Sequence, residues 1–458
     1  MKKILAVLAF MLVAACLVAP KIIAPKHQEK LAEIVASINK ATGYSAHIIS
    51  THSAWFGSEN KVLVSYDISP LDTSGQSQKL ETELLIITHY GPLLFSKQGI
   101  VGLYSTDIHI SGEKERPILN WNKDLPLYQL SILGDFNGNI KVADSIPKFS
   151  NPDNGIQFGG YSGQGEFKAQ KFSYQGTLQQ VDMTGRLPPI KVEKFTVSID
   201  LDSDLDTLMS GGFYKSKTNF SLDRLSVGTD TELSGIKIKV GSDLDKETQL
   251  GKVTLDYYIN HMTYGEIEVN DLAMLTELTN LSNRFFTDFK TFSNKVPVHV
   301  DSQESNYEKL LTFMQENIAE LLAQKPQFNI TEFKSSFPEG NFTGNLSSHF
   351  ANIQTPTLNE LISPDFWLYN TVIKANIKVD EPLLRDLAEQ FIANKMRAPK
   401  NAPQVKLQVQ RLLQSLVDGG ILKGPEKTVI QSDRYFYSSE LLIKSGQARI
   451  NDTPFPLM

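Results

Sequence analysis

The chain has 458 residues, of which 41% are hydrophobic and 21% charged, with 51 acidic against 45 basic side chains. This length suits two or three domains, and the hydrophobic content excludes a disordered chain. The formal net charge of -6 and the lack of a basic stripe argue against a nucleic-acid partner.

The N-terminus has the pattern of a membrane-targeting segment. Lys2 and Lys3 precede an uninterrupted apolar run, residues 4–15, which extends to Pro20. Basic residues beside an apolar segment stay on the cytoplasmic side of the membrane, so the remainder of the chain would face the periplasm. We therefore expect a protein of the inner membrane, on its periplasmic face, in a Gram-negative envelope.

Three interpretations of this segment remain open. Residues 1–25 can be a retained signal anchor, or an ordinary signal peptide cut near Ala15 or Ala19. They can also be a lipoprotein signal, because Val13-Ala14-Ala15-Cys16 fits a lipobox and makes Cys16 the candidate lipidation site. Cys16 is the single cysteine of the chain, which excludes an intrachain disulfide and a thiolate metal cluster.

The next region changes from helix to strand periodicity. Residues 27–41 predict an amphipathic helix, and residues 45–272 predict a long series of strands. Alternating apolar and polar residues are typical of a sheet with one buried face. The clearest alternating runs are residues 62–68, 80–88, 106–110, 195–201 and 236–240. Turn residues separate the runs, which favours an antiparallel meander, open or rolled.

The last region alternates helix pairs with strands. Helices are predicted at residues 272–294, 305–324, 381–396 and 404–418. Strands are predicted at residues 327–333, 341–350, 370–379, 435–443 and 448–451. The predicted fold class is α+β, mainly an antiparallel β meander with interspersed helix pairs behind an N-terminal anchor. The predicted divisions are 1–25 for the anchor, 26–272 for the helix and long β region, and 273–458 for the helix pairs with strands.

A search for chemistry identifies no catalytic, cofactor-binding or metal-binding residue. His89 ends a predicted strand, where a structural role is the simpler interpretation. Four aspartates alternate in the manner of a calcium loop: Asp200, Asp202, Asp204 and Asp206. Leu205 and Gly211 stand where that loop needs glycine and a bidentate glutamate, so we interpret the series as a solvated strand face. We expect a protein without cofactors that is not an enzyme.

A second feature is the strand of residues 86–89, which runs through Tyr90 into the turn Gly91-Pro92-Leu93. With the Lys-flanked anchor and the C-terminal stretch 438–452, it resembles the YdgA/YihF-like family of unknown function, found in Gram-negative envelopes. In this chain Tyr90 is inserted between the family's His and Gly, and Asp452 replaces a Gly. The resemblance implies an inner-membrane-anchored periplasmic protein, makes a homodimer a candidate assembly and supplies no catalytic residues. The β-rich layout is also similar to that of AsmA-type envelope proteins, which move or hold lipids.

These observations favour a non-enzymatic envelope protein that binds a lipid or another apolar ligand, or that scaffolds a complex. Its sheet would then present an apolar groove wider than its own side chains can fill. The alternatives are a lipoprotein assembly factor and an enzyme acting on envelope polymers. Converging carboxylates or a histidine cluster in a cleft would favour the enzyme.

Overall fold

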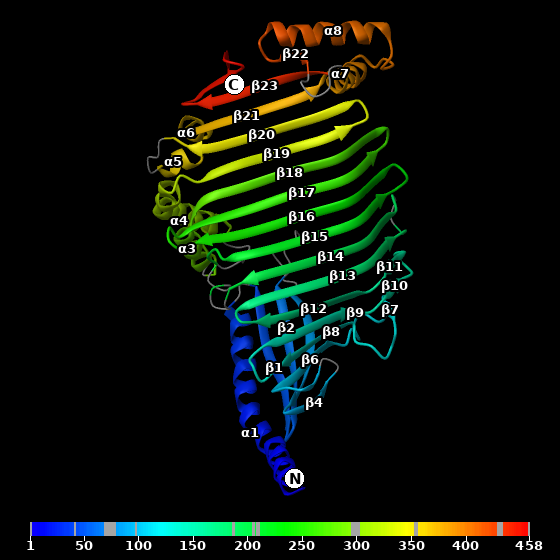
Figure 1. The fold of residues 1–458 in the computed structure, drawn as a ribbon, viewed down its shortest axis with the longest axis vertical. Helices are drawn as coiled ribbons and strands as arrows, with labels where there is room; N and C mark the ends of the chain where they lie inside the picture. The colour runs from blue at the N-terminus through cyan, green and yellow to red at the C-terminus, as the bar shows by residue number, and fades with distance from the viewer. Residues whose placement is uncertain are drawn as a thin grey trace. The chain divides into compact units, whose positions relative to one another are not determined.

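The structure is a computed structural model that describes residues 2–40, 43–67, 79–96, 99–185, 188–203, 207, 211–294, 303–351, 356–427 and 434–456. Its strands make a large open antiparallel sheet of 23 strands with helices beside it (Figure 1), which confirms the predicted β meander. The chain divides into two compact units. The first holds residues 1–211 and 287–310, and the second holds residues 212–286 and 311–458.

The first unit contains helix α1 (Lys2–Lys40) and the first fourteen strands. These are β1 (Tyr44–Ala54), β2 (Gly57–Asp67), β3 (Lys79–Tyr90), β4 (Leu93–Ser96), β5 (Gly99–Val101), β6 (Tyr104–Ile110), β7 (Asn120–Trp121), β8 (Tyr128–Gly134), β9 (Ile140–Ile146), β10 (Phe149–Asn151), β11 (Ile156–Phe158), β12 (Tyr161–Lys168), β13 (Lys171–Met183) and β14 (Ile190–Asp202). The main antiparallel order is β1-β2-β3-β6-β8-β9-β12-β13-β14.

Helix α1 runs without a break through Pro20 and Pro25, so the predicted helix at 27–41 is its C-terminal part. There Leu31 packs on Ala46, Val62 and Ile86, which fastens α1 to β1, β2 and β3. Among the helices that the structure describes, we find none with both the length and the apolar character needed to cross a membrane.

The predicted turn after β3 is present at Gly91-Pro92. A Cβ atom on Gly91 would lie 1.7 Å from the carbonyl oxygen of Gly102. Glycine is therefore required here because the two backbone segments approach each other closely.

The second unit contains the remaining strands. These are β15 (Lys215–Val227), β16 (Thr231–Asp245), β17 (Leu250–Tyr264), β18 (Ile267–Ser282), β19 (Gln327–Phe337), β20 (Gly340–Phe350), β21 (Thr371–Asp380), β22 (Lys423–Lys427), β23 (Tyr435–Lys444), β24 (Gln447–Ile450) and β25 (Thr453–Phe455). Strands β15 to β21 pair in chain order, and β23 follows β21. Helices α5 (Leu358–Leu361), α6 (Pro364–Asn370), α7 (Glu381–Met396) and α8 (Pro403–Asp418) also belong here. Helices α3 (Asn283–Ser293) and α4 (Gln303–Ala323) are divided between the units.

One predicted element is wrong in its first half. The helix expected at 272–294 is strand β18 as far as Ser282, and helix α3 begins only at Asn283. The leucines spaced by three suggested a helix, but Leu275 and Leu278 lie on opposite faces of the strand. A bulge near Asn280, which has φ +58°, shifts the register before Leu281. Pairing with β17 and β19 on both sides overrides the local pattern.

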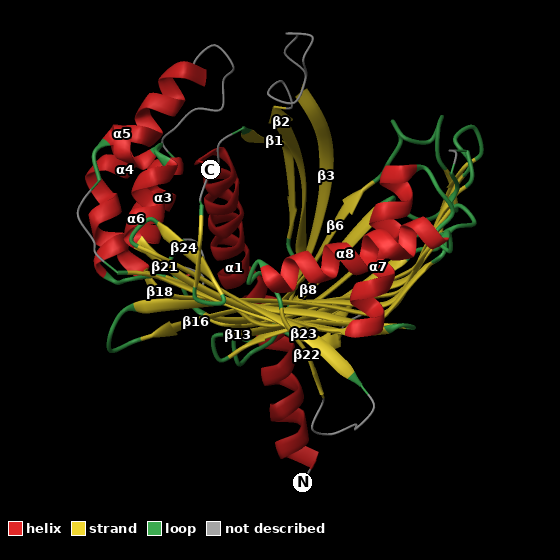
Figure 2. Ribbon diagram, turned by 90° about the horizontal axis from the view of Figure 1, so that it is seen from above, coloured by secondary structure: helices red, strands yellow, loops and turns green. Residues whose placement is uncertain are grey.

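In the second unit the helices gather over the two ends of the strands (Figure 2). At one end Leu383 of α7 packs with Val379 and Tyr437 of the sheet. At the other end Trp367 of α6 lies 5.8 Å from the ring of Phe350, measured between centroids. The middle of the strands lies between these two contacts.

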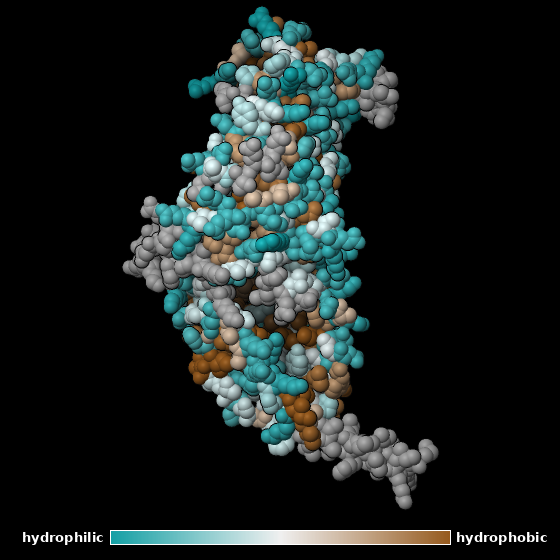
Figure 3. All heavy atoms as spheres, turned by 90° about the vertical axis from the view of Figure 1, so that its left-hand side faces the viewer, coloured by the Kyte–Doolittle hydropathy of each residue, from teal (hydrophilic) through white to brown (hydrophobic). Residues whose placement is uncertain are grey.

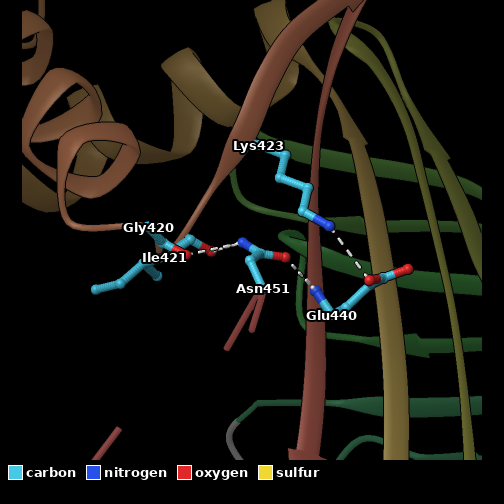
Figure 4. A network of polar contacts seen from close by, with 5 residues as sticks. All are labelled: Gly420, Ile421, Lys423, Glu440 and Asn451. Atoms are coloured by element: carbon cyan, nitrogen blue, oxygen red, sulfur yellow. Dashed lines mark hydrogen bonds and ion pairs between the residues drawn. The ribbon is translucent and has the colours of Figure 1, made fainter. Parts of the chain in front are cut away.

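The side-chain amide of Asn451 connects two segments in the C-terminal part of this unit (Figure 4). Asn451 donates from Nδ2 to the carbonyl oxygens of Gly420 and Ile421, at 2.9 and 3.0 Å. Its Oδ1 accepts from the backbone N–H of Glu440 at 2.9 Å. The segment after α8 is thereby held against β23.

Candidate ligand-binding face

The second unit has a sheet with one apolar face, which follows from its register. Residues paired across strands share a face, and alternate residues along a strand share it too. One row joins Ile238, Tyr257, Met274 and Phe333. A second row joins Ile330, Leu346, Ala375 and Leu441. With Val240, Leu255, Ile373 and Ile377, these residues define what we call the apolar face of β15–β23.

The opposite face of the same strands is polar. Lys239 pairs with Asp256, and Asn345 pairs with Asn376. Glu277 accepts a hydrogen bond from Lys252 at 2.6 Å, and both side chains lie on this face. One face is therefore suited to water and the other is not.

The apolar face is only partly covered by the described residues. Beneath α7 its side chains are buried, as Val379 and Tyr437 show at 7% and 6% exposure. Elsewhere on the face Leu278 is 40% exposed, Phe328 39% and Ile377 45%. A closed sandwich core would bury such positions to a few per cent. Leu278 and Phe328 are paired across β18 and β19, and exposed apolar neighbours of this kind are typical of an interaction site.

The first unit also has an apolar sheet face, but with one carboxylate in it. A row across six strands joins Ile108, Leu130, Asp144, Gly163, Gly176 and Val197. The next row includes Ile132, Val142 and Ile199, so apolar side chains lie beside Asp144.

Three tyrosines surround this carboxylate. Tyr174 donates from Oη to Asp144 Oδ1 at 2.8 Å, and Tyr128 donates to Oδ2 at 3.3 Å. Tyr161 and Tyr174 hydrogen-bond each other through their hydroxyls. Burial, followed by the nearby Asp144 carboxylate, raises the pKa of Tyr128 to about 12. Burial also raises the pKa values of Tyr161 and Tyr174, so all three phenols stay protonated and able to donate.

Two glycines make room for these rings. A Cβ atom on Gly163 would lie 2.0 Å from Tyr174 Oη, and one on Gly176 would lie 2.0 Å from Tyr161 Oη. The rings therefore lie across bare backbone in the centre of the face. We call Asp144 with Tyr128, Tyr161 and Tyr174 the tyrosine–aspartate cluster.

The second polar feature of this unit lies under α1. His27 Nε2 is 3.1 Å from Thr106 Oγ1, and Thr106 Oγ1 is 3.1 Å from Thr88 Oγ1. The rings of Tyr90 and Tyr104 contact His27 edge-on at 5.8 and 5.5 Å. Burial lowers the pKa of His27, and its Nδ1 is buried without a hydrogen-bond partner.

Comparison with known proteins places the chain in a family. Over residues 1–458 it matches the family described as "Bacterial protein of unknown function (DUF945)". The chain belongs to this family. Neither a curated protein nor a solved structure matches this DUF945 protein.

The structure disperses the residues that the sequence singled out in this DUF945 protein. His89 is exposed near the end of β3 and pairs with Ser105. Asp202 lies 3.5 Å from Lys171 in an exposed ion pair, and Asp200 is exposed on β14. Asp204, Asp206 and the side chain of Cys16 lie outside the described residues. In the part of the chain that is described, no three His, Cys, Asp or Glu side chains gather in a group that could hold a metal ion.

Neither polar site of this protein is predicted from the sequence, although each leaves a signal there. In Ile140–Ile146 the alternation puts Asp144 at a position where its neighbours Ile140, Val142 and Ile146 are apolar. His27 precedes Leu31 by four residues, so it lies on the apolar stripe of the helix. In each case the signal is a polar residue at a position where the strand or helix periodicity predicts an apolar one.

Proposed function

We propose that this protein is a non-enzymatic component of the bacterial envelope that binds lipid acyl chains on the apolar face of β15–β23. The observation that carries the proposal is the partial exposure of that face, at residues such as Leu278, Phe328 and Ile377. Burying such a surface against acyl chains is favourable by about 25 cal/mol per Å².

The dimensions of the face suit this ligand. Eight strands in order, β15 to β21 and then β23, at about 4.8 Å spacing give a width of roughly 34 Å. The hydrocarbon core of a bilayer is about 30 Å thick and holds two layers of acyl chains. A lipid chain laid across the strands therefore finds apolar contacts along its whole length.

We also propose that the N-terminal segment attaches the protein to the inner membrane, with the remainder in the periplasm. The support is the apolar run of residues 4–15 after Lys2 and Lys3. Val18 and Ile22 of α1 are 56% and 60% exposed. Figure 3 shows apolar surface in the lower half of that view. On this interpretation the chain is a YdgA/YihF-like member of its family.

An experiment can distinguish attachment through a lipid on Cys16 from attachment through a retained N-terminal segment. Lipidation of Cys16 would require cleavage before it. The intact mass of the membrane-extracted protein distinguishes a retained N-terminus from a chain that begins at an acylated Cys16. Cys16→Ser leaves the mass and location of a retained anchor unchanged apart from the substitution itself.

The absence of enzymatic activity is likewise part of the proposal. Its support is that charged groups of the first unit serve local structure. Lys61 lies 3.5 Å from Glu83 in an ion pair. Arg116 donates to the carbonyl oxygens of Trp121, Lys123 and Leu125.

Native mass spectrometry of the full chain, extracted gently from membranes, tests the proposal. We expect stoichiometric lipid on the wild-type protein, and loss of most of it from the triple variant Leu278→Ser, Phe328→Ser, Ile377→Ser. The matched control replaces three exposed apolar residues outside the apolar face: Ile118 and Phe136 on turns, and Tyr264 at the end of β17, which are 57%, 54% and 64% exposed. The control variant should keep its lipid.

The outcomes separate the alternatives. A wild-type mass without lipid, or equal loss of lipid from both variants, overturns the proposal. A homodimer without lipid that becomes monomeric in the triple variant would instead assign the face to self-association.

A further inference from the structure

We propose that the tyrosine–aspartate cluster holds the ammonium headgroup of an amphiphile whose alkyl chain lies on the neighbouring apolar side chains. This inference rests on the proposed binding of lipid and adds the chemical class of the headgroup. It concerns the first unit and is argued from that unit alone.

Asp144 places a carboxylate within an apolar surface. Its carboxylate lies between Leu130 and Gly163 in a row of an otherwise apolar face. Within the described part of the chain, its hydrogen-bonding partners are Tyr128 and Tyr174, and no Lys or Arg forms an ion pair with it. A carboxylate without a countercharge on an apolar surface favours the arrival of a cation.

The cluster can accept further hydrogen bonds. A carboxylate has about four acceptor sites, and the two phenol hydroxyls occupy two of them. An ammonium group carries only donors, so it can use the remaining sites without displacing the tyrosines. An anionic headgroup would be repelled from the same place.

The tyrosine hydroxyl groups add acceptors beside the carboxylate. Tyr128 and Tyr174 donate to Asp144, so their hydroxyl oxygens lie next to it and keep lone pairs that can accept from an ammonium group. Burial and the Asp144 carboxylate keep Tyr128 protonated with a pKa of about 12, so the cluster has one negative charge and not more. A single positive headgroup therefore neutralises it.

The alkyl chain of the amphiphile has apolar side chains to lie on. Ile132, Val142 and Ile199 lie in the row next to Asp144 and are half-buried. A chain attached to an ammonium at Asp144 can lie on these side chains without crossing a polar strip. The cluster and the apolar row together form one amphiphile site.

Photolabelling of the full chain in phosphatidylglycerol nanodiscs tests this inference, because that lipid has no amine to compete. Three probes share one diazirine-bearing alkyl chain and differ in the headgroup: ammonium, carboxylate or hydroxyl. Peptides from β9, β12 and β13 are quantified by mass spectrometry. We expect the ammonium probe to label them roughly tenfold more than the other two, as a hydrogen bond to a charged group implies.

The isosteric variant Asp144→Asn should remove this preference. Asp200→Asn is the matched control, because Asp200 lies on the opposite, polar face of β14 and loses the same charge. It should retain the preference. If Asp144→Asn does not fold, the comparison of the three probes on the wild-type chain still decides the question.

Equal labelling by the three probes overturns the headgroup assignment and leaves the proposed lipid binding intact. Loss of the preference in Asp200→Asn as well also overturns it. Failure of every probe to label the sheet strands of either unit counts against the proposed function itself.

Discussion

His27 of α1 lies 3.1 Å from Thr106 of β6, measured from Nε2 to Oγ1, although the two residues are 79 positions apart in the chain. This polar contact helps to pack the helix on the sheet. Helix–sheet packing usually relies on apolar side chains. Leu31, one turn later, makes the apolar contact with Val62 and Ile86. The attachment of α1 therefore has a polar part that can respond to pH.

The first prediction concerns pH. Burial lowers the pKa of His27 when α1 is docked, whereas the pKa of the ring is about 6.5 when the helix is undocked. Docking therefore favours the neutral form of the ring. The stabilisation is complete above that value and is lost as the pH falls through it towards the lower pKa of the docked state. A protonated ring would also bury its Nδ1–H without an acceptor. Hydrogen exchange of residues 27–38, corrected for intrinsic rates, should speed up between about pH 7.5 and about pH 5.5.

The controls for this prediction are two glutamine variants. His27→Gln cannot gain the charge and should exchange at a rate that is independent of pH in this range. His89→Gln changes an exposed histidine of β3 and should respond as the wild type does. An unchanged pH response in His27→Gln would show that another group is responsible.

The second prediction concerns the glycines beneath the tyrosine rings. Gly163→Ala puts a Cβ atom 2.0 Å from Tyr174 Oη and 2.3 Å from Asp144 Oδ1, so the ring must move. We expect a loss of about 1–3 kcal/mol in unfolding free energy by urea titration, because overpacking costs that much. Gly344→Ala is the control: its nearest neighbour is Asn376 O at 3.3 Å, and it should lose less than about 1 kcal/mol. Equal losses of unfolding free energy in the two variants would mean that the Tyr174 ring moves aside at little cost.

The third prediction concerns Asn451. In Asn451→Asp the carboxylate keeps an acceptor for Glu440 N–H but loses both hydrogen bonds to Gly420 O and Ile421 O. It would place a negative charge against two carbonyl oxygens, at a cost of about 1–3 kcal/mol. Asn376→Asp changes an exposed amide that donates to Asn345 at 2.9 Å and should cost well under 1 kcal/mol, about the value of a surface substitution. Hydrogen exchange at residues 420–423 measures the local effect, and wild-type protection in Asn451→Asp would contradict it.

The fourth prediction concerns the packing of α7 on the sheet. Leu383 is 1% exposed and contacts Val379 and Tyr437, so Leu383→Ala should destabilise the second unit by about 2–5 kcal/mol. Leu387, one turn later on the same helix, is 45% exposed. Leu387→Ala should cost less than about 1 kcal/mol. Urea unfolding followed by the fluorescence of Trp367 in the second unit, with Trp55 and Trp121 of the first unit replaced by Phe in every variant, measures both. Similar losses would place the core elsewhere.

Helices α7 and α8 could be predicted because their apolar stripes are long and bounded. Pro403 opens α8 and Gly419 closes it, close to the predicted 404–418. The end of β18 could not be predicted, because its leucines fit a helix as well as a strand until β17 and β19 pair with it. The short helices α5 and α6 have too few residues for a periodic signal, although Thr357 forms a capping box.

The candidate sites also could not be predicted fully from local sequence patterns. Alternation in β16 predicts that Ile236, Ile238 and Val240 share a face, and the structure places them so. Alternation does not reveal what covers a face. The exposure of Leu278, Phe328 and Ile377 depends on where the helices pack, which is a property of the assembled unit.

By itself, the sequence determined the antiparallel β meander, the two faces of its strands and most of the helices, because periodicity and turn residues act over a few positions. Only the tertiary structure decided which apolar face stays open and which polar residues meet in it. Asp144, Tyr161 and Tyr174 come from three strands, and His27 meets Thr106 across 79 positions. Such contacts depend on strand register and helix docking, which arise from long-range pairing. In the sequence they are marked only by a single polar residue at a position where the pattern expects an apolar one.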